Sequence, residues 1–375
     1  MRRPLTRYEL EMIRIDEMNR SLVSIERVGI YGIIAIVIAF GIFFHSMCFA
    51  GETYKIAWSH YTGWEPWQLA ADRGIIKKWA DKYGINIELS PPIDYIESIN
   101  LYTAGAYHGV VITNMDVLTI PSSGGIKSEA IIVGDFSNGN DGLVSRKAKS
   151  VTDLLGAEIK LVQLTVSHYL LARALDINKM SERNVTLVNT SDSDIAALFA
   201  ADPKGNVVTW NPPLLQCKSV RGANLLFDSS KIPGEIIDLL VVRADTPPEL
   251  KKALTGAWYE TMALMSARSQ EGKKAIQHMA KFSGGTEAEF RAQLRTTRMF
   301  YTPQEALGFT ASPDLKKTME YVRQFCFTHG LFGSGATSKD YIGIKFPDGS
   351  VIGDPKNVKL FFNADYMGMA AAGKL

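Results

Sequence analysis

The segment Tyr61–Trp67 combines aromatic faces with one carboxylate and contains no Lys or Arg. It follows a short apolar stretch, Lys55 to Trp58, that is typical of a strand, and it leads into a predicted helix. Loops between a strand and a helix are where α/β proteins bind small ligands. These residue types suit a small, flat, polar or cationic ligand better than an anion. The alternative is that both tryptophans pack in the core and that Glu65 only favours a helix N-terminus.

Other polar side chains follow predicted strands in the same way. Asp116 comes after the apolar stretch Gly109–Thr113, where a carboxylate without a partner is costly, so we expect it in a binding site. The predicted substrate-binding residues are Trp64, Glu65, Asp94, Asp116, Asp141, Ser167, Trp210 and Asp238. Besides Trp64 and Glu65, three more of them have simpler alternatives, which are a helix cap for Asp94 and Ser167 and an ordinary turn for Asp141.

The predicted strand-end loops of the first lobe, which supply the candidate carboxylates, carry no Lys or Arg before Arg146. An anion-binding site is expected to place such a side chain there, besides backbone N–H groups at helix starts. Guanidinium needs carboxylate acceptors in its plane and can stack on aromatic faces. Urea needs acceptors and one donor, but it requires no net negative charge. The residues therefore favour a cation and leave urea open.

The N-terminus is distinct from the rest of the chain. Val28 to Phe44 is apolar and uncharged, several arginines precede it, and the next charged residue is Glu52. This charge asymmetry places the N-terminus in the cytoplasm and the remainder outside, so we expect a periplasmic protein. Residues 1–50 are predicted to be a signal peptide cut before Gly51 or, if uncleaved, a membrane anchor over residues 28–50. Met18 is an alternative start that gives a shorter basic leader.

Composition excludes several other classes. The chain has 375 residues, 46% apolar and 21% charged, with a formal net charge of +2, which is ordinary for a soluble globular protein and gives no sign of a nucleic-acid partner. After the leader only Cys217 and Cys326 remain, and we expect both to be unpaired. No metal-binding or phosphate-binding motif is present, so no cofactor and no metal are expected, and His168 is interpreted as a packed histidine.

The order of predicted elements indicates fold class. Strands and helices alternate up to about residue 210, which predicts α/β units with a mostly parallel sheet, and amphipathic helices follow from Pro247. Chain crossings near Leu143–Arg146 and Val241–Ala244 predict a hinged clamshell that binds its ligand between the lobes. The predicted domains are residues 1–50 as leader, 51–145 plus 243–375 as lobe 1, and 146–242 as lobe 2.

Three motifs in the second half carry a family resemblance. Ser150–Gly156, the helix start Ser167–Leu171 and the strand end Trp210–Pro212 resemble, in order and spacing, the solute-binding proteins of ABC importers in the nitrate, sulfonate and taurine class. The resemblance covers residues 53 to about 330 and implies the periplasmic-binding-protein clamshell. Asn211 departs from the pattern, because the family has an acid there, and this puts a direct charge contact at that position in doubt.

A narrower resemblance concerns the ligand. Trp64–Trp67, Asn114–Asp116 and the ending Val358–Tyr366 resemble a branch linked to urea-carboxylase pathways, which implies urea or guanidinium as ligand. The expected function is that of a monomeric extracytoplasmic binding protein that delivers its ligand to an ABC permease in the inner membrane. The alternatives are a binder of a sulfonate, taurine or nitrate anion, a membrane-anchored sensor domain, and an enzyme of the thiamine-pyrimidine precursor synthase type.

Overall fold

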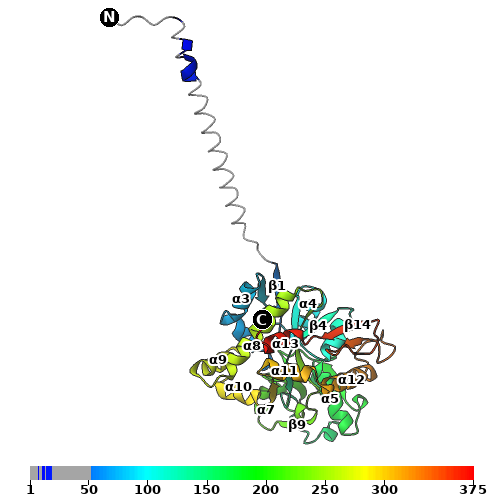
Figure 1. Ribbon diagram of the computed structural model, residues 1–375. Helices are drawn as coiled ribbons and strands as arrows, with labels where there is room; N and C mark the ends of the chain where they lie inside the picture. Colours follow the sequence, from blue (N-terminus) through cyan, green and yellow to red (C-terminus); the bar gives the residue numbers. More distant parts are fainter. Residues whose placement is uncertain (1–6, 8–10, 13, 19–51) are drawn as a thin grey trace. The chain divides into compact units, whose positions relative to one another are not determined.

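Two β-sheets organise the protein. The computed structural model describes residues 7, 11, 12, 14–18 and 52–375, and residues 52–375 form one compact unit (Figure 1). The described residues before position 19 are helical and exposed. The predicted anchor, 28–50, lies outside the described residues, as does most of the predicted leader. Among the described residues, no helix is both long enough and apolar enough to cross a membrane.

The first sheet and the helices around it form what we call lobe 1. Its strands, in spatial order, are β13 (Val351–Ile352), β12 (Gly343–Lys345), β14 (Val358–Phe362), β4 (Ser128–Ser137), β10 (Ile237–Arg243), β3 (Gly109–Thr113), β1 (Thr53–Ala57) and β2 (Asn86–Leu89), with β11 (Thr297–Met299) paired to β4. The second sheet and its helices form lobe 2. Its order is β7 (Thr186–Asn189), β6 (Glu158–Leu161), β8 (Asn206–Trp210), β5 (Asp141–Ser145) and β9 (Asn224–Asp228).

Both sheets are mixed rather than mostly parallel. β10 runs antiparallel to β3 and β4, and β5 runs antiparallel to β8 and β9. The prediction of a mostly parallel sheet was wrong because β5 and β10 are the strands by which the chain enters a lobe from the other one. Each starts at the edge where its neighbours β8, β3 and β4 end. This edge of each sheet therefore collects both strand ends and strand starts.

The chain changes sheet at two places. It leaves β4 at Ser137 and begins β5 at Asp141, and it leaves β9 at Asp228 and begins β10 at Ile237. The predicted crossings, Leu143–Arg146 and Val241–Ala244, each span the C-terminal half of a strand, β5 or β10, and the first residue after it. The predicted lobe boundaries at 145/146 and 242/243 thus fall C-terminal to the points where the chain changes sheet.

Helices cover both sheets. In lobe 1 they are α2 (Pro66–Asp72), α3 (Ile75–Lys82), α4 (Tyr95–Thr103), α8 (Pro248–Ser266), α9 (Gln270–Phe282), α10 (Glu287–Leu294), α11 (Pro303–Thr310), α12 (Pro313–Thr328) and α13 (Asp365–Ala371). In lobe 2 they are α5 (Val166–Ile177), α6 (Ile195–Ala201) and α7 (Pro213–Ser219). Short turns of other helix types complete the list: Leu118–Ser122, Val151–Leu154, Glu182–Asn184 and Ser229–Lys231. The predicted helices at 270–282 and 313–328 are confirmed.

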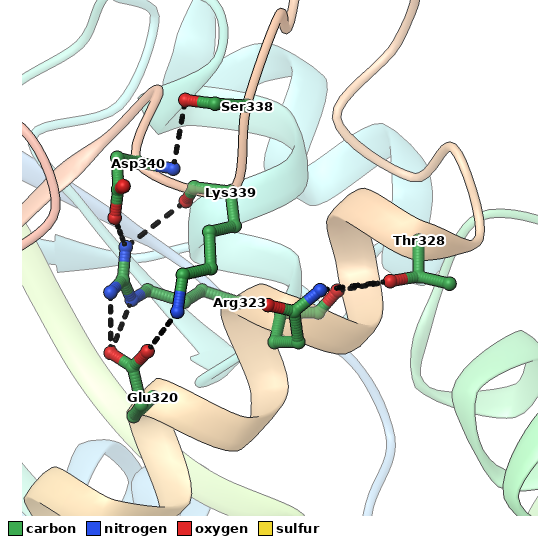
Figure 2. A network of polar contacts seen from close by, with 7 residues as sticks. Glu320, Arg323, Thr328, Ser338, Lys339 and Asp340 are labelled. Atoms are coloured by element: carbon green, nitrogen blue, oxygen red, sulfur yellow. Dashed lines mark hydrogen bonds and ion pairs between the residues drawn. The ribbon is translucent and has the colours of Figure 1, made fainter.

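A buried arginine ties the C-terminal segment to α12. The Arg323 guanidinium, in a residue 5% exposed, donates to Glu320 on the same helix and to Asp340 Oδ1 at 2.6 Å (Figure 2). It also donates to the Lys339 carbonyl at 3.1 Å, and the Lys339 ammonium donates to Glu320 Oε1 at 2.8 Å. The bidentate geometry of Arg suits this role. The network fixes the loop that leads into the β12–β13 hairpin, whose predicted pairing is confirmed.

Both cysteines are structural. Cys217 is buried in the small core of lobe 2 together with Val144 and Phe199, and Cys326 is buried on α12. Neither is in a disulfide, which confirms the prediction. Burial raises the pKa of the Cys217 thiol to about 12, so it is protonated and unreactive at neutral pH.

Candidate ligand-binding site

An aromatic box lies between the two sheets. The Trp64 ring centroid is 5.1 Å from that of Tyr61 and 5.5 Å from that of Tyr95, and Tyr95 meets Trp210 of lobe 2 edge-on at 5.4 Å. All of these rings are buried. Residues 61–64 form the turn after β1, in which Trp64 N–H donates to the Tyr61 carbonyl at 2.8 Å. This turn presents Trp64 to the space between the lobes.

The box surrounds a small cavity. About 10 Å³ of free space, room for roughly one water molecule, lies between atoms of Tyr61, Trp64, Tyr95, Thr113, Asp141, Val166, Trp210, Ile236 and Asp238. A second cavity, also of about 10 Å³, lies behind Trp64, lined by Trp67, Val111, Ile132, Gly134, Asp135, Leu239, Leu240 and Trp258, and again by Trp64 and Asp238. Neither lining contains Lys, Arg or His. A ligand of a few heavy atoms therefore fits here only if the side chains around it move apart.

Buried carboxylates converge on these cavities from several strand ends. Asp135 lies near the end of β4, Asp238 near the start of β10, and Asp141 at the start of β5. Each is at most 2% exposed, and Asp135 Oδ1 and Oδ2, Asp141 Oδ2 and Asp238 Oδ2 accept no hydrogen bond of ordinary geometry in the described part of the chain, although Asp135 and Asp238 lie close enough to interact with each other. Burial raises the pKa of Asp135 and of Asp141 to about 7 and raises that of Asp238 well above its usual range.

Asp116 joins the two lobes. Its Oδ2 accepts hydrogen bonds from the Tyr95 hydroxyl at 2.6 Å, from Thr113 Oγ1 at 2.9 Å and from the Val166 N–H at 3.2 Å, the last being the first residue of α5 in lobe 2. Its Oδ1 is buried and has no hydrogen-bond partner among the described residues. Burial raises the pKa of Asp116 to about 6, although all three donors favour the charged form. A carboxylate at a helix N-terminus is electrostatically stabilised, so Asp116 helps to hold the lobes together.

The structure brings only part of the predicted set to the cavity. Trp64, Asp141, Trp210 and Asp238 line it. Glu65 is fully buried, and its Oε1 lies 2.8 Å from His60 Nδ1, while its Oε2 has no hydrogen-bond partner among the residues that the structure describes. Burial raises the pKa of Glu65 despite the nearby imidazole.

Asp94 and Ser167 lie outside the cavity lining. Asp94 occupies the N-cap position of α4, but its side chain makes no capping bond and instead accepts from Ser191 of lobe 2 at 3.2 Å. The helix cap suggested for Ser167 is wrong, because Thr165 caps α5 and accepts the Ser167 N–H at 3.3 Å. The Ser167 hydroxyl is buried, and it makes no hydrogen bond within the part of the chain that the structure describes. Whether any of the predicted residues contacts a ligand stays a prediction.

Sequence reasoning missed Asp135, Tyr61 and Tyr95. Asp135 directly follows the apolar run Ala130–Gly134, which is the same pattern that predicts a site role for Asp116. Tyr61 lies within the Tyr61–Trp67 segment, and the sequence around Tyr95, in the first turn of α4, does not distinguish it from a core aromatic. Trp67 is packing, since it stacks on Trp258 at 5.0 Å.

Comparisons with known proteins agree on the fold. No family model matches the chain, and no curated protein matches its sequence. Among solved structures, the alkanesulfonate-binding protein SsuA from Xanthomonas axonopodis pv. citri, bound to MOPS, is similar with a TM-score of 0.63, 14% identity and coverage of 77% of this chain and 97% of that one. The periplasmic nitrate-binding protein NrtA from Synechocystis PCC 6803 is similar with a TM-score of 0.62, 12% identity and coverage of 86% and 89%.

An enzyme shares the same architecture. The desulfurization enzyme DSZB is similar with a TM-score of 0.52, 13% identity and coverage of 74% of this chain and 93% of that one. The protein therefore has the two-lobed α/β fold of periplasmic binding proteins, as predicted. At these identities the likeness concerns the fold alone, and the choice between binding and catalysis must come from the site.

Proposed function

We propose that this chain is an extracytoplasmic substrate-binding protein of an ABC importer, which closes its two lobes on a small nitrogen-rich solute, guanidinium or urea. The two-lobed fold and the polar and aromatic side chains that meet between the sheets support the binding role. In this proposal residues 1–50 direct the chain to the periplasm, and a membrane permease receives the ligand. The binding protein acts as a monomer.

The observation that carries the choice of ligand is the set of buried carboxylates without a positive partner. Asp135, Asp141 and Asp238 have unpaired oxygens at the cavities, whose linings contain no Lys or Arg. Burying charge without a partner is expensive, and a bound cation would supply the partner. Guanidinium is planar and carries N–H donors along its edge, so carboxylates can accept in its plane while the Trp64 and Trp210 faces cover it. We therefore favour guanidinium over urea.

An anion is the second candidate. It is favoured by the solved structures of similar fold, two of which are described as binding an alkanesulfonate and nitrate. In this chain an anion would meet unpaired carboxylates, and the backbone N–H of Val166 at the start of α5 is already bonded to Asp116. An enzyme of this fold is the third candidate. Neither Cys217 nor Cys326 lines the cavities, so a thiol is not positioned for chemistry there.

Calorimetric titration of the purified protein with guanidinium, urea, taurine and nitrate tests the proposal. We expect guanidinium to bind most tightly, and the isosteric variant Asp141→Asn to weaken it by more than tenfold, or about 1.4 kcal/mol. Asp72→Asn on the outer face of α2 is the matched control, because it removes one carboxylate far from the cavities. Tight binding of taurine or nitrate would contradict the proposal. Tight urea binding without a guanidinium response would retain the importer role and exclude the cation.

A further inference from the structure

Asp135 and Asp238 form a cross-strand pair at the cleft edge of lobe 1. In the antiparallel ladder between β4 and β10, Asp238 stands directly opposite Asp135, so both side chains lie on the same face of the sheet. Asp238 lines both cavities and Asp135 lines the inner one. The pair therefore forms the boundary between the space beside Trp64 and the space behind it.

Among the residues that the structure describes, no Lys, Arg or His acts on this pair from the elements packed around it. The titratable groups that interact with it are Asp141 of β5, the Tyr61 hydroxyl of the turn before α2 and Tyr301 after β11. Arg298 on the adjacent strand β11 is exposed and donates to the Met299 carbonyl and to Glu305. Two buried carboxyls in this setting cannot both ionise, so one proton is shared between them. The raised pKa of each carboxyl agrees with this.

Independent features indicate that a ligand completes the pair. The Tyr61 hydroxyl and the Trp64 indole N–H are buried in residues 4% and 3% exposed, and neither makes a hydrogen bond of ordinary geometry within the described residues. Both side chains line the same cavity as Asp238. Gly63 leaves room at this point, because a Cβ there would lie 2.5 Å from Asp135 Oδ2. Buried polar groups without a hydrogen-bond partner are rare in native protein structures.

We propose that the Asp135–Asp238 pair discriminates between ligands by their charge. The empty protein holds one proton between the two carboxyls, and a bound monocation replaces that proton, which is released to solvent. This inference rests on the proposed function. The exchange is balanced in charge, since one cation enters as one proton departs. A neutral solute such as urea displaces no proton and leaves the pair in its protonated form. Selectivity for guanidinium over urea therefore increases with pH.

The test is calorimetry of the full chain with guanidinium chloride near pH 7 in two buffers, phosphate and Tris, whose ionisation enthalpies differ. We expect the difference in measured enthalpy to correspond to release of about one proton per bound cation, and the affinity to rise about tenfold per pH unit while the pair is protonated. Asp135→Asn and Asp238→Asn should each weaken binding and abolish most of the proton release. Asp72→Asn should change neither quantity.

The possible failures are distinguishable. If guanidinium binds with the same enthalpy in both buffers and with pH-independent affinity, the shared-proton role is overturned while the proposed function stands. Proton release that persists in both Asp135→Asn and Asp238→Asn also overturns it, by assigning the proton to another group. If guanidinium does not bind at all, the proposed ligand and this inference fail together. The two-buffer measurement on the unmodified chain decides the central point even if a variant does not fold.

Discussion

The Trp210 indole nitrogen donates a 3.1 Å hydrogen bond to the backbone carbonyl of His60. Trp210 ends β8 in lobe 2 and His60 lies in the loop after β1 in lobe 1, so this bond joins the two lobes. The same indole ring forms part of the cavity wall. Trp210 therefore belongs both to the cavity wall and to the contact between the lobes.

Trp210→Phe should weaken ligand binding without unfolding the protein. The variant keeps an aromatic wall but loses one hydrogen bond, worth about 0.5–1.5 kcal/mol, or roughly two- to tenfold in affinity. Calorimetry with guanidinium measures the change. Trp79→Phe is the matched control, because Trp79 Nε1 donates to Glu260 at 2.7 Å on the helical side of lobe 1. Equal losses in both variants would show that the His60 bond has no special role.

Gly63→Ala should reduce affinity by at least tenfold. The added Cβ would lie 2.5 Å from Asp135 Oδ2 and 2.8 Å from the Tyr61 ring, so one of these side chains must move out of the site. Because the close atoms belong to side chains rather than backbone, the fold should persist. Gly308→Ala in α11 meets no atom within 4 Å and serves as control, with a gain in stability of about 0.5–1 kcal/mol. Unchanged guanidinium affinity in Gly63→Ala would remove Asp135 from the binding site.

The sequence indicates which polar residues lie at the ends of individual strands, but not which of these residues meet in the fold. Asp116 was identified because a carboxylate directly after a fully apolar strand needs a partner. Its actual partners, Tyr95 and the Val166 N–H, are distant in sequence and lie on different lobes. Likewise nothing local shows that β10 inserts between β3 and β4, which is what places Asp238 opposite Asp135. The fold class could be predicted from element order, whereas the site depends on this insertion.

The empty protein should lose stability as pH rises from about 5 to 8. In the folded state the pKa of Asp116 is about 6 and those of Asp135 and Asp141 are about 7, against the ordinary value of 3.8 when unfolded. The folded state thus binds more protons in this range, and stability falls as they dissociate, by about 1.4 kcal/mol per unit of pKa shift at most. Scanning calorimetry across this range measures the effect.

Ligand and variant controls sharpen this prediction. Saturating guanidinium should raise the melting temperature more at pH 8 than at pH 5, since the carboxylates are charged at the higher pH. Asp141→Asn should flatten the pH dependence, because it removes one of the buried titrating groups. A melting temperature that increases steadily from pH 5 to 8 in the empty protein would contradict the assignment of these carboxyls as buried and unpaired.

A second acidic pair lies at the contact between the lobes. Ser191 of lobe 2 donates to Asp94 Oδ2 at 3.2 Å, and the Tyr95 N–H of lobe 1 donates to Asp192 Oδ1 at 3.4 Å, which brings the two carboxyls together. Burial and the contact with Asp94 raise the pKa of Asp192 to about 7. Below this pH a proton on Asp192 permits the contact, and above it the two negative charges repel across the lobe boundary.

The lobes of the empty protein should therefore separate more readily at pH 8 than at pH 5. Small-angle X-ray scattering should record a larger radius of gyration at pH 8, and Asp192→Asn should suppress the increase, because the amide keeps a donor toward Asp94 and cannot ionise. Asp194→Asn is the control, since Asp194 is exposed and its side chain makes no capping bond to α6. The Asp94–Asp192 contact does not govern closure if the unmodified protein has the same radius of gyration at both pH values. The same conclusion follows if the radius of Asp192→Asn increases as much as that of the unmodified protein.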